Sequence, residues 1–85
     1  MNGSKMTKNF FFQMIEKRLY KLAQEVEELK TREDLSFEER ISRENILFGR
    51  MIELNNINSY AMDVDYRRYI ELDEKIRTVR ISFFR

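Results

Sequence analysis

Apolar residues recur along the N-terminal third of the chain with the spacing of a helix that has one buried face. From Phe12 to Leu29 they alternate between steps of three and four residues, which is the a/d repeat of a packed helix. Thr7 is suited to cap such a helix. We therefore predict a helix over residues 7–31, preceded by a disordered leader over residues 1–6. The residues of this seam are Phe12, Ile15, Leu19, Leu22, Val26 and Leu29.

A second helix is indicated by a start signal that follows a short charged segment. Ser36 is followed three residues later by Glu39, and this pair has the form of a capping box, in which the two residues satisfy each other's backbone N–H groups. We predict a helix over residues 37–57, and a link of about five residues implies an antiparallel hairpin. Its apolar positions are Ile41, Leu47, Phe48, Met51, Ile52 and Leu54.

The C-terminal part leaves three alternatives open. The heptad phase of the second helix continues to Phe83, so one long helix can extend to about residue 80. Asn and Ser residues at positions 55–59 compete with helical hydrogen bonds, which favours a break and a third helix over about residues 60–80. Alternating apolar residues from Tyr60 to Tyr66 are instead typical of a strand, and would make the fold α+β with a C-terminal β-hairpin. We favour an all-α single domain over residues 7–85.

The composition removes most of the side chains on which catalysis depends. The 85 residues include no Cys, His or Pro and only two Gly. The usual general base at neutral pH and the strongest nucleophile are therefore absent, as are thiolate ligands for zinc and a glycine-rich loop for phosphate. We expect no enzyme, no catalytic residues, no metal and no cofactor or small-molecule substrate. Lacking a long apolar run, the chain is expected to be cytoplasmic, without membrane contact.

Charge is distributed unevenly, although the net charge is only +1. Residues 1–22 contain five basic side chains and one acidic, residues 23–45 contain eight acidic and four basic, and residues 76–85 contain three basic and none acidic. Nucleic-acid binding is thus an alternative function, provided the basic ends meet. In a three-helix bundle the C-terminus would instead lie beside the acidic turn. The candidate contacts are Lys17, Arg18, Lys21, Arg77 and Arg80.

Three consecutive phenylalanines point to a contact beyond the helical seam. Phe12 belongs to the seam and Phe11 flanks it, whereas Phe10 lies on the opposite side of the helix, joined off the core by Met14 and Tyr20. One helical neighbour cannot cover all of these side chains. We therefore predict a small non-enzymatic interaction module, such as a regulator, adaptor or inhibitor, that binds a protein of unknown identity and forms a homodimer. The predicted contact residues are Phe10, Phe11, Met14 and Tyr20.

Overall fold

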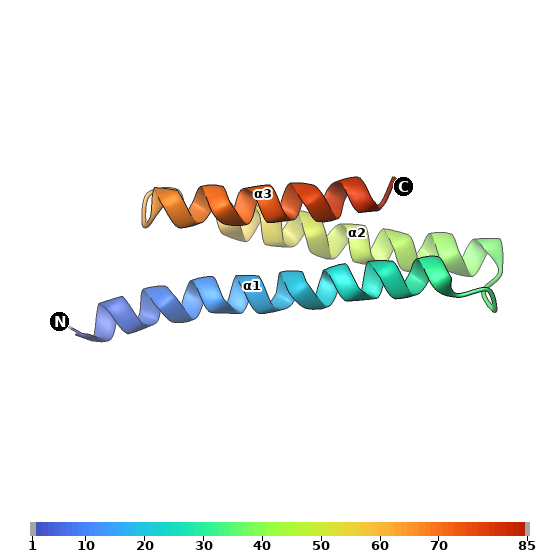
Figure 1. Ribbon diagram of the computed structural model, residues 1–85, viewed down its shortest axis with the longest axis horizontal. Helices are drawn as coiled ribbons and strands as arrows, with labels where there is room; N and C mark the ends of the chain where they lie inside the picture. Colours follow the sequence, from blue (N-terminus) through green and yellow to red (C-terminus); the bar gives the residue numbers. More distant parts are fainter. Residues whose placement is uncertain (1, 85) are drawn as a thin grey trace.

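The computed structural model describes the backbone of residues 2–84 and the side chains from residue 8 to residue 84. It contains three helices, α1 (Asn2–Thr31), α2 (Phe37–Ser59) and α3 (Tyr66–Ser82). They run up, down and up in an elongated bundle of 53 × 19 × 15 Å, with α3 beside the hairpin of α1 and α2 (Figure 1). The all-α fold with a third helix is confirmed.

The alternative β-hairpin is wrong, since the described residues contain no strand. The alternating apolar residues lie in the α2–α3 connection (residues 60–65) and at the start of α3, not in an extended segment. Within α3, Arg77 pairs with Asp73 one turn earlier at 3.1 Å, a spacing that supports a helix. In this structure α2 and α3 also do not form a single long helix, because the chain reverses between them.

Helix α1 follows the predicted seam throughout. All six seam residues are buried, from Phe12 at 0% exposure to Leu29 at 6%, so the heptad pattern correctly identified the face that packs. The helix begins at Asn2, earlier than the predicted start near Thr7. The leader over residues 1–6 remains a prediction, because the side chains of residues 1–7 lie outside the described part of the chain.

The turn between α1 and α2 is held by polar contacts at both helix ends. Ser36 caps α2, its Oγ accepting from the backbone N–H of Glu39 at 3.2 Å as the capping box predicts. The Arg40 guanidinium donates to the carbonyl of Leu29 at 2.6 Å and also to the carbonyl of Arg32. A side chain of α2 thereby satisfies carbonyl groups that the end of α1 leaves without helical partners.

The break after α2 comes later than its sequence suggests. The helix continues through Asn55–Ser59 and ends at Ser59, partly because the Ser59 hydroxyl donates back to the Asn56 carbonyl at 2.6 Å instead of disrupting the turn. Asp65 then caps α3, accepting from the backbone N–H of Arg68 at 3.3 Å. The third helix therefore begins at Tyr66, not near residue 60.

The core consists of two hydrophobic clusters along the bundle. One lies at the end where α3 begins and joins α1, α3 and the α2–α3 connection; its buried members are Phe12, Ile15, Ala61 and Leu72. The other fills the rest of the bundle and contains Leu19, Leu22, Val26, Leu29, Leu47, Met51, Leu54, Ile76 and Val79.

One polar side chain lies fully inside this core. Asn58 is only 1% exposed, and its Nδ2 donates to the carbonyl of Tyr69 at 3.2 Å, linking the end of α2 to α3. Its Oδ1 has no hydrogen-bond partner among the described residues. A buried amide of this kind lowers stability but favours one helix register over others.

Within residues 2–84, none of the three helices has the length and hydrophobicity required of a membrane-crossing segment.

Candidate protein-interaction surfaces

The four contact residues predicted from α1 do not form one surface. Phe10 and Tyr20 are strongly exposed, at 69% and 68%, but ten residues of helix place them about 80° apart around the axis and about 15 Å apart along it. Phe11 is half-buried against the core, with its ring 5.5 Å from that of Phe12, and Met14 is also half-buried. The structure therefore leaves Phe10 and Tyr20 as separate exposed side chains.

The contact between α1 and α3 near Phe12 is partly ionic. The Arg68 guanidinium lies 4.8 Å from the centre of the Phe12 ring and donates to Asn9 at 3.3 Å and Glu16 at 3.4 Å. Lys8 pairs with Asp65 at 3.1 Å. The start of α3 is thus attached to α1 by charged side chains around the buried cluster.

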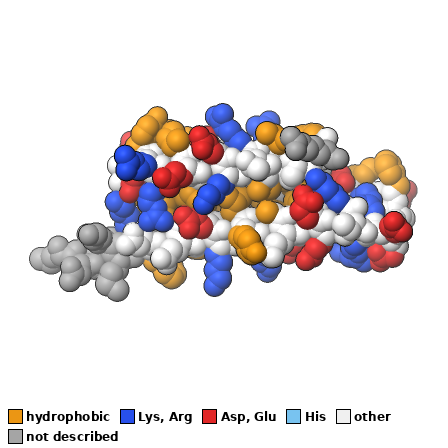
Figure 2. Space-filling model, viewed as in Figure 1, with side chains coloured by type: hydrophobic (Ala, Val, Ile, Leu, Met, Phe, Trp, Pro, Cys, Tyr) orange, Lys and Arg blue, Asp and Glu red, His pale blue; other side chains and the backbone are white. Residues whose placement is uncertain are grey.

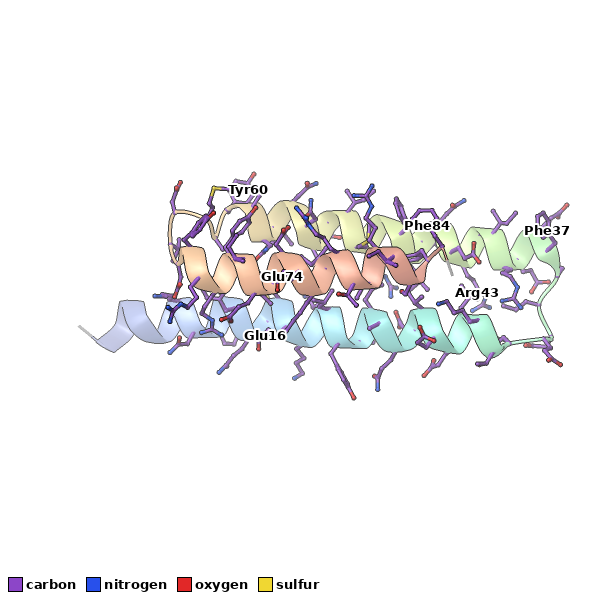
Figure 3. All side chains as sticks on the ribbon, turned by 45° about the horizontal axis from the view of Figure 1, so that its top comes forward. Glu16, Phe37, Arg43, Tyr60, Glu74 and Phe84 are labelled. Carbon is purple, nitrogen blue, oxygen red and sulfur yellow. The ribbon has the colours of Figure 1, made fainter. Side chains whose placement is uncertain are left out.

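A first exposed apolar surface, which we call the connection surface, lies at the end of the bundle where α3 begins. It comprises Tyr60, Met62, Val64 and Tyr66, which are between 43% and 79% exposed. Figure 2 shows hydrophobic side chains gathered at this end, and Figure 3 shows Tyr60 directed away from the bundle. The sequence signal is the alternation from residue 60 to residue 66, which we weighed only as support for the alternative strand.

A second apolar surface, the aromatic patch, lies where α3 ends over α2. The ring of Phe48 is 5.4 Å from that of Phe83 and 6.5 Å from that of Phe84, and Phe84 is 76% exposed. Ile41 and Ile52 lie within about 40° of Phe48 around α2, and both are exposed. The helix α3 ends at Ser82, and Figure 3 shows Phe84 well short of Phe37 at the start of α2. The first turns of α2 therefore extend beyond the end of α3.

The candidate nucleic-acid contacts are divided among the three grooves of the bundle. Arg18 and Lys21 line the groove between α1 and α2, together with two glutamates, and Arg77 and Arg80 line the groove between α2 and α3. Lys17 lies in the third groove, between α1 and α3. The structure therefore does not combine the basic ends of the sequence into one surface.

Two carboxyl groups near the helix ends have lowered pKa values. The hydrogen bond from Lys8, followed by that from the Arg68 backbone, holds the pKa of Asp65 below its ordinary value. The hydrogen bond from Arg32 does the same for the pKa of Asp34. Both groups remain ionised at neutral pH and serve as acceptors, so neither is suited to donate a proton.

The described residues bring no three metal-ligating side chains into one group, and the grooves are lined by mixed apolar and charged side chains. The exposed apolar surfaces are the features of this molecule that its own packing does not account for. Comparison of the chain with protein-family models, curated proteins and solved structures found no match.

Proposed function

We propose that this chain is a non-enzymatic protein-interaction module that self-associates through helical packing at the end where α3 begins. The observation that carries the proposal is the connection surface. Four large apolar side chains lie exposed within seven residues, and contiguous exposed apolar side chains of this kind mark contact sites more often than they mark free surface.

The small size of the molecule supports self-association. A chain of this length buries only about two thirds of its unfolded surface, so covering apolar area on a second copy adds stability that a single bundle lacks. The connection surface lies at one end of an elongated bundle, where a second bundle can approach without displacing a helix.

The aromatic patch lies at the other end of α3 and is the surface that we assign to a separate protein partner. Aromatic rings that are clustered and partly exposed contribute strongly to binding when a partner buries them. A regulator, adaptor or inhibitor acts in this way, by covering a surface of another protein. We do not extend the proposal to nucleic acid, because the basic side chains lie in three different grooves.

Sedimentation equilibrium over a concentration series tests the proposal. The double variant Met62→Ser/Val64→Ser should weaken self-association by about tenfold or more, since each dimer loses two copies of the apolar contact. Ile46→Ser/Ile81→Ser is the matched control, because Ile46 and Ile81 are 56% and 52% exposed, close to the 57% and 43% of Val64 and Met62, and lie elsewhere on the bundle. This control should self-associate as the wild type does.

A wild type that stays monomeric up to millimolar concentration would contradict the proposal. So would a wild-type dimer that the control variant weakens as much as the connection-surface variant does.

A further inference from the structure

The α2–α3 connection reverses the chain without a residue that breaks a helix. Residues 60–65 include no Gly or Pro, and Tyr60 has right-handed helical dihedral angles. Backbone N–H groups continue to bond three residues back, from Ala61 to Asn58 at 2.9 Å and from Val64 to Ala61 at 3.0 Å. Residues 60–64 thus follow a nearly helical path, but Asp65 is extended (φ −157°, ψ 94°), so joining α2 and α3 into one helix requires the backbone of Asp65 to become helical.

The buried positions recur at intervals of three or four residues across most of the connection, as they do in a helix. In α2 they end with Leu54, Asn58 and Ala61, and in α3 they run from the half-buried Tyr69 through Leu72. Asp65 lies midway, four residues from Ala61 and four from Tyr69. A helix that continued through residues 60–65 would keep one seam, with a single additional four-residue step of the kind that coiled coils accommodate.

We call the form in which α3 packs on its own hairpin, as in this structure, the closed form. Few contacts favour the closed form over one in which α2 and α3 make a continuous helix. Asp65 caps α3 and pairs with Lys8, and both side chains are partly exposed to water, where such pairs contribute little. The apolar side chains of the connection surface remain between 43% and 79% exposed in the closed form, with the Tyr66 ring 6.0 Å from that of Tyr69.

We infer that two copies of this chain exchange α3. In the exchanged dimer, α2 and α3 form one helix over residues 37–82, and α3 packs against α1 and α2 of the other copy. This inference rests on the proposed self-association and specifies how it occurs. Only a second copy offers the same groove, so both hydrophobic clusters and the contacts of Asn58 and Arg68 re-form between chains.

Exchange also places part of the connection surface in a contact. The two long helices run antiparallel and pass each other at residues 60–65. Around a continuous helix, Met62 and Tyr66 lie roughly 120–160° from Tyr60 and Val64, so the four side chains cannot all face the other copy. Met62 lies nearest the seam, and it is the exposed side chain that the second copy covers.

A charge-exchange experiment distinguishes α3 packed in its own chain from α3 packed on a partner. Glu16 of α1 and Arg68 of α3 form an ion pair at 3.4 Å. Glu16→Arg and Arg68→Glu each place like charges at this contact within their own homodimers. Mixed exchanged dimers instead have opposite charges at both contacts, because each α3 lies on the other variant's α1.

The matched control uses an ion pair that exchange does not move. Glu25 of α1 and Arg50 of α2 pair at 2.7 Å within the hairpin, which stays in one chain in either form. Glu25→Arg mixed with Arg50→Glu has the same change of net charge as the test mixture, so it measures the attraction between oppositely charged chains alone.

Native mass spectrometry of the equimolar mixtures gives the ratio of mixed to unmixed dimers. We expect this ratio to be about tenfold or more higher for the Glu16 and Arg68 mixture than for the control mixture, because repulsive contacts become attractive at four positions. The double variant Glu16→Arg/Arg68→Glu, alone, should dimerise as the wild type does.

Equal ratios in the two mixtures, together with a dimeric wild type, would overturn the exchange while leaving the proposed self-association intact. Monomers in the wild type and in both mixtures would overturn both proposals.

Discussion

The two connections of the bundle join antiparallel helices by different means. The α1–α2 turn is charged, and polar contacts fix it from both sides: Ser36 caps the helix that follows, and Arg40 bonds to carbonyl groups at the end of the helix that precedes. The α2–α3 connection is apolar and exposed. It is held by the cap at Asp65 and the pair with Lys8, and a continuous helix would carry the seam across it with one additional four-residue step.

This difference shows how a sequence specifies either a turn that stays a turn or one that a continuous helix can replace in a dimer. At the first turn, the charged residues 32–34 interrupt the apolar seam, so a straight helix would gain no buried contacts there. At the second, a straight helix keeps the seam, and the choice depends on whether α3 finds its groove in the same chain or in another. The predictions below test this contrast.

Removal of a core side chain shared by both forms should have the largest effect. Leu72 is 1% exposed and lies in the cluster that holds α3 to α1, so Leu72→Ala should lower the free energy of unfolding by about 2–5 kcal/mol. Denaturant unfolding followed by circular dichroism measures it. Because the same contact re-forms after exchange, the monomer–dimer balance should change much less than the stability. A loss below about 1 kcal/mol would mean that α3 is not docked as described.

Loosening the first turn should cost less. Arg40→Ala removes the charged donor to the Leu29 carbonyl, and we expect a loss of about 1–3 kcal/mol in the free energy of unfolding. The exposed Arg43 of the same helix serves as the control, and Arg43→Ala should change stability by no more than about 0.5 kcal/mol. Equal effects of the two substitutions would mean that the contacts of Arg40 do not stabilise this turn.

The helix caps of the two connections should differ in what they control. Ser36→Ala and Asp65→Ala each remove one cap and should each cost about 1 kcal/mol in the closed form. Only Asp65→Ala should also favour the dimer, because a continuous helix needs no cap at residue 65. Two chains open in each dimer, so the dissociation constant should fall by about 25-fold. Sedimentation equilibrium of both variants measures the two dissociation constants. Equal shifts in the Ser36→Ala and Asp65→Ala variants would contradict this prediction.

The smallest effect concerns pH at the second connection. Asp65→Asn keeps an acceptor for the Arg68 N–H but loses the charge that pairs with Lys8. Since the pKa of Asp65 is lowered in the folded state from its ordinary 3.8, the charge stabilises the fold above that value, and the contribution is lost as the pH falls through the lowered pKa. Thermal unfolding should show a wild-type advantage at pH 7 that decreases as the pH falls below 3.8 and is lost below the lowered pKa of Asp65. An advantage that persists unchanged in acid would have another cause.

The fold was predictable where hydrophobic periodicity and capping chemistry agree. The α1 seam meets the requirement to bury one face, and the Ser36 cap satisfies a free N–H group at the start of α2; both are confirmed. The Glu39 carboxylate, however, accepts from the Ser36 hydroxyl and not from the backbone N–H that a full capping box would use. The position of the second break was not predictable from Asn and Ser content. Asn58 is accommodated by a bond to the Tyr69 carbonyl, and Ser59 by one to Asn56 within its own helix.

The exposed apolar surfaces were predictable only in part. Phe10 and Tyr20 are exposed as expected, but Phe11 packs on the core because it faces the neighbouring helices. The aromatic patch depends on where α3 ends relative to α2, and no local pattern specifies that length difference. At residues 60–66 the sequence does not distinguish a strand from a connection between helices. Alternation of apolar and polar residues does not show which other elements pack beside this segment.

The central claim, exchange of α3, is tested most directly by a distance within one chain of the dimer. The chain has no cysteine, so spin labels can be attached through Glu38→Cys and Thr78→Cys, both exposed positions in α2 and α3. Dilution with excess unlabelled protein leaves only the intrachain pair visible to pulsed electron resonance. At dimer-forming concentrations a continuous helix predicts about 60 Å between the two positions, and the closed bundle about 20 Å. A dimer that shows only the short distance would contradict the exchange.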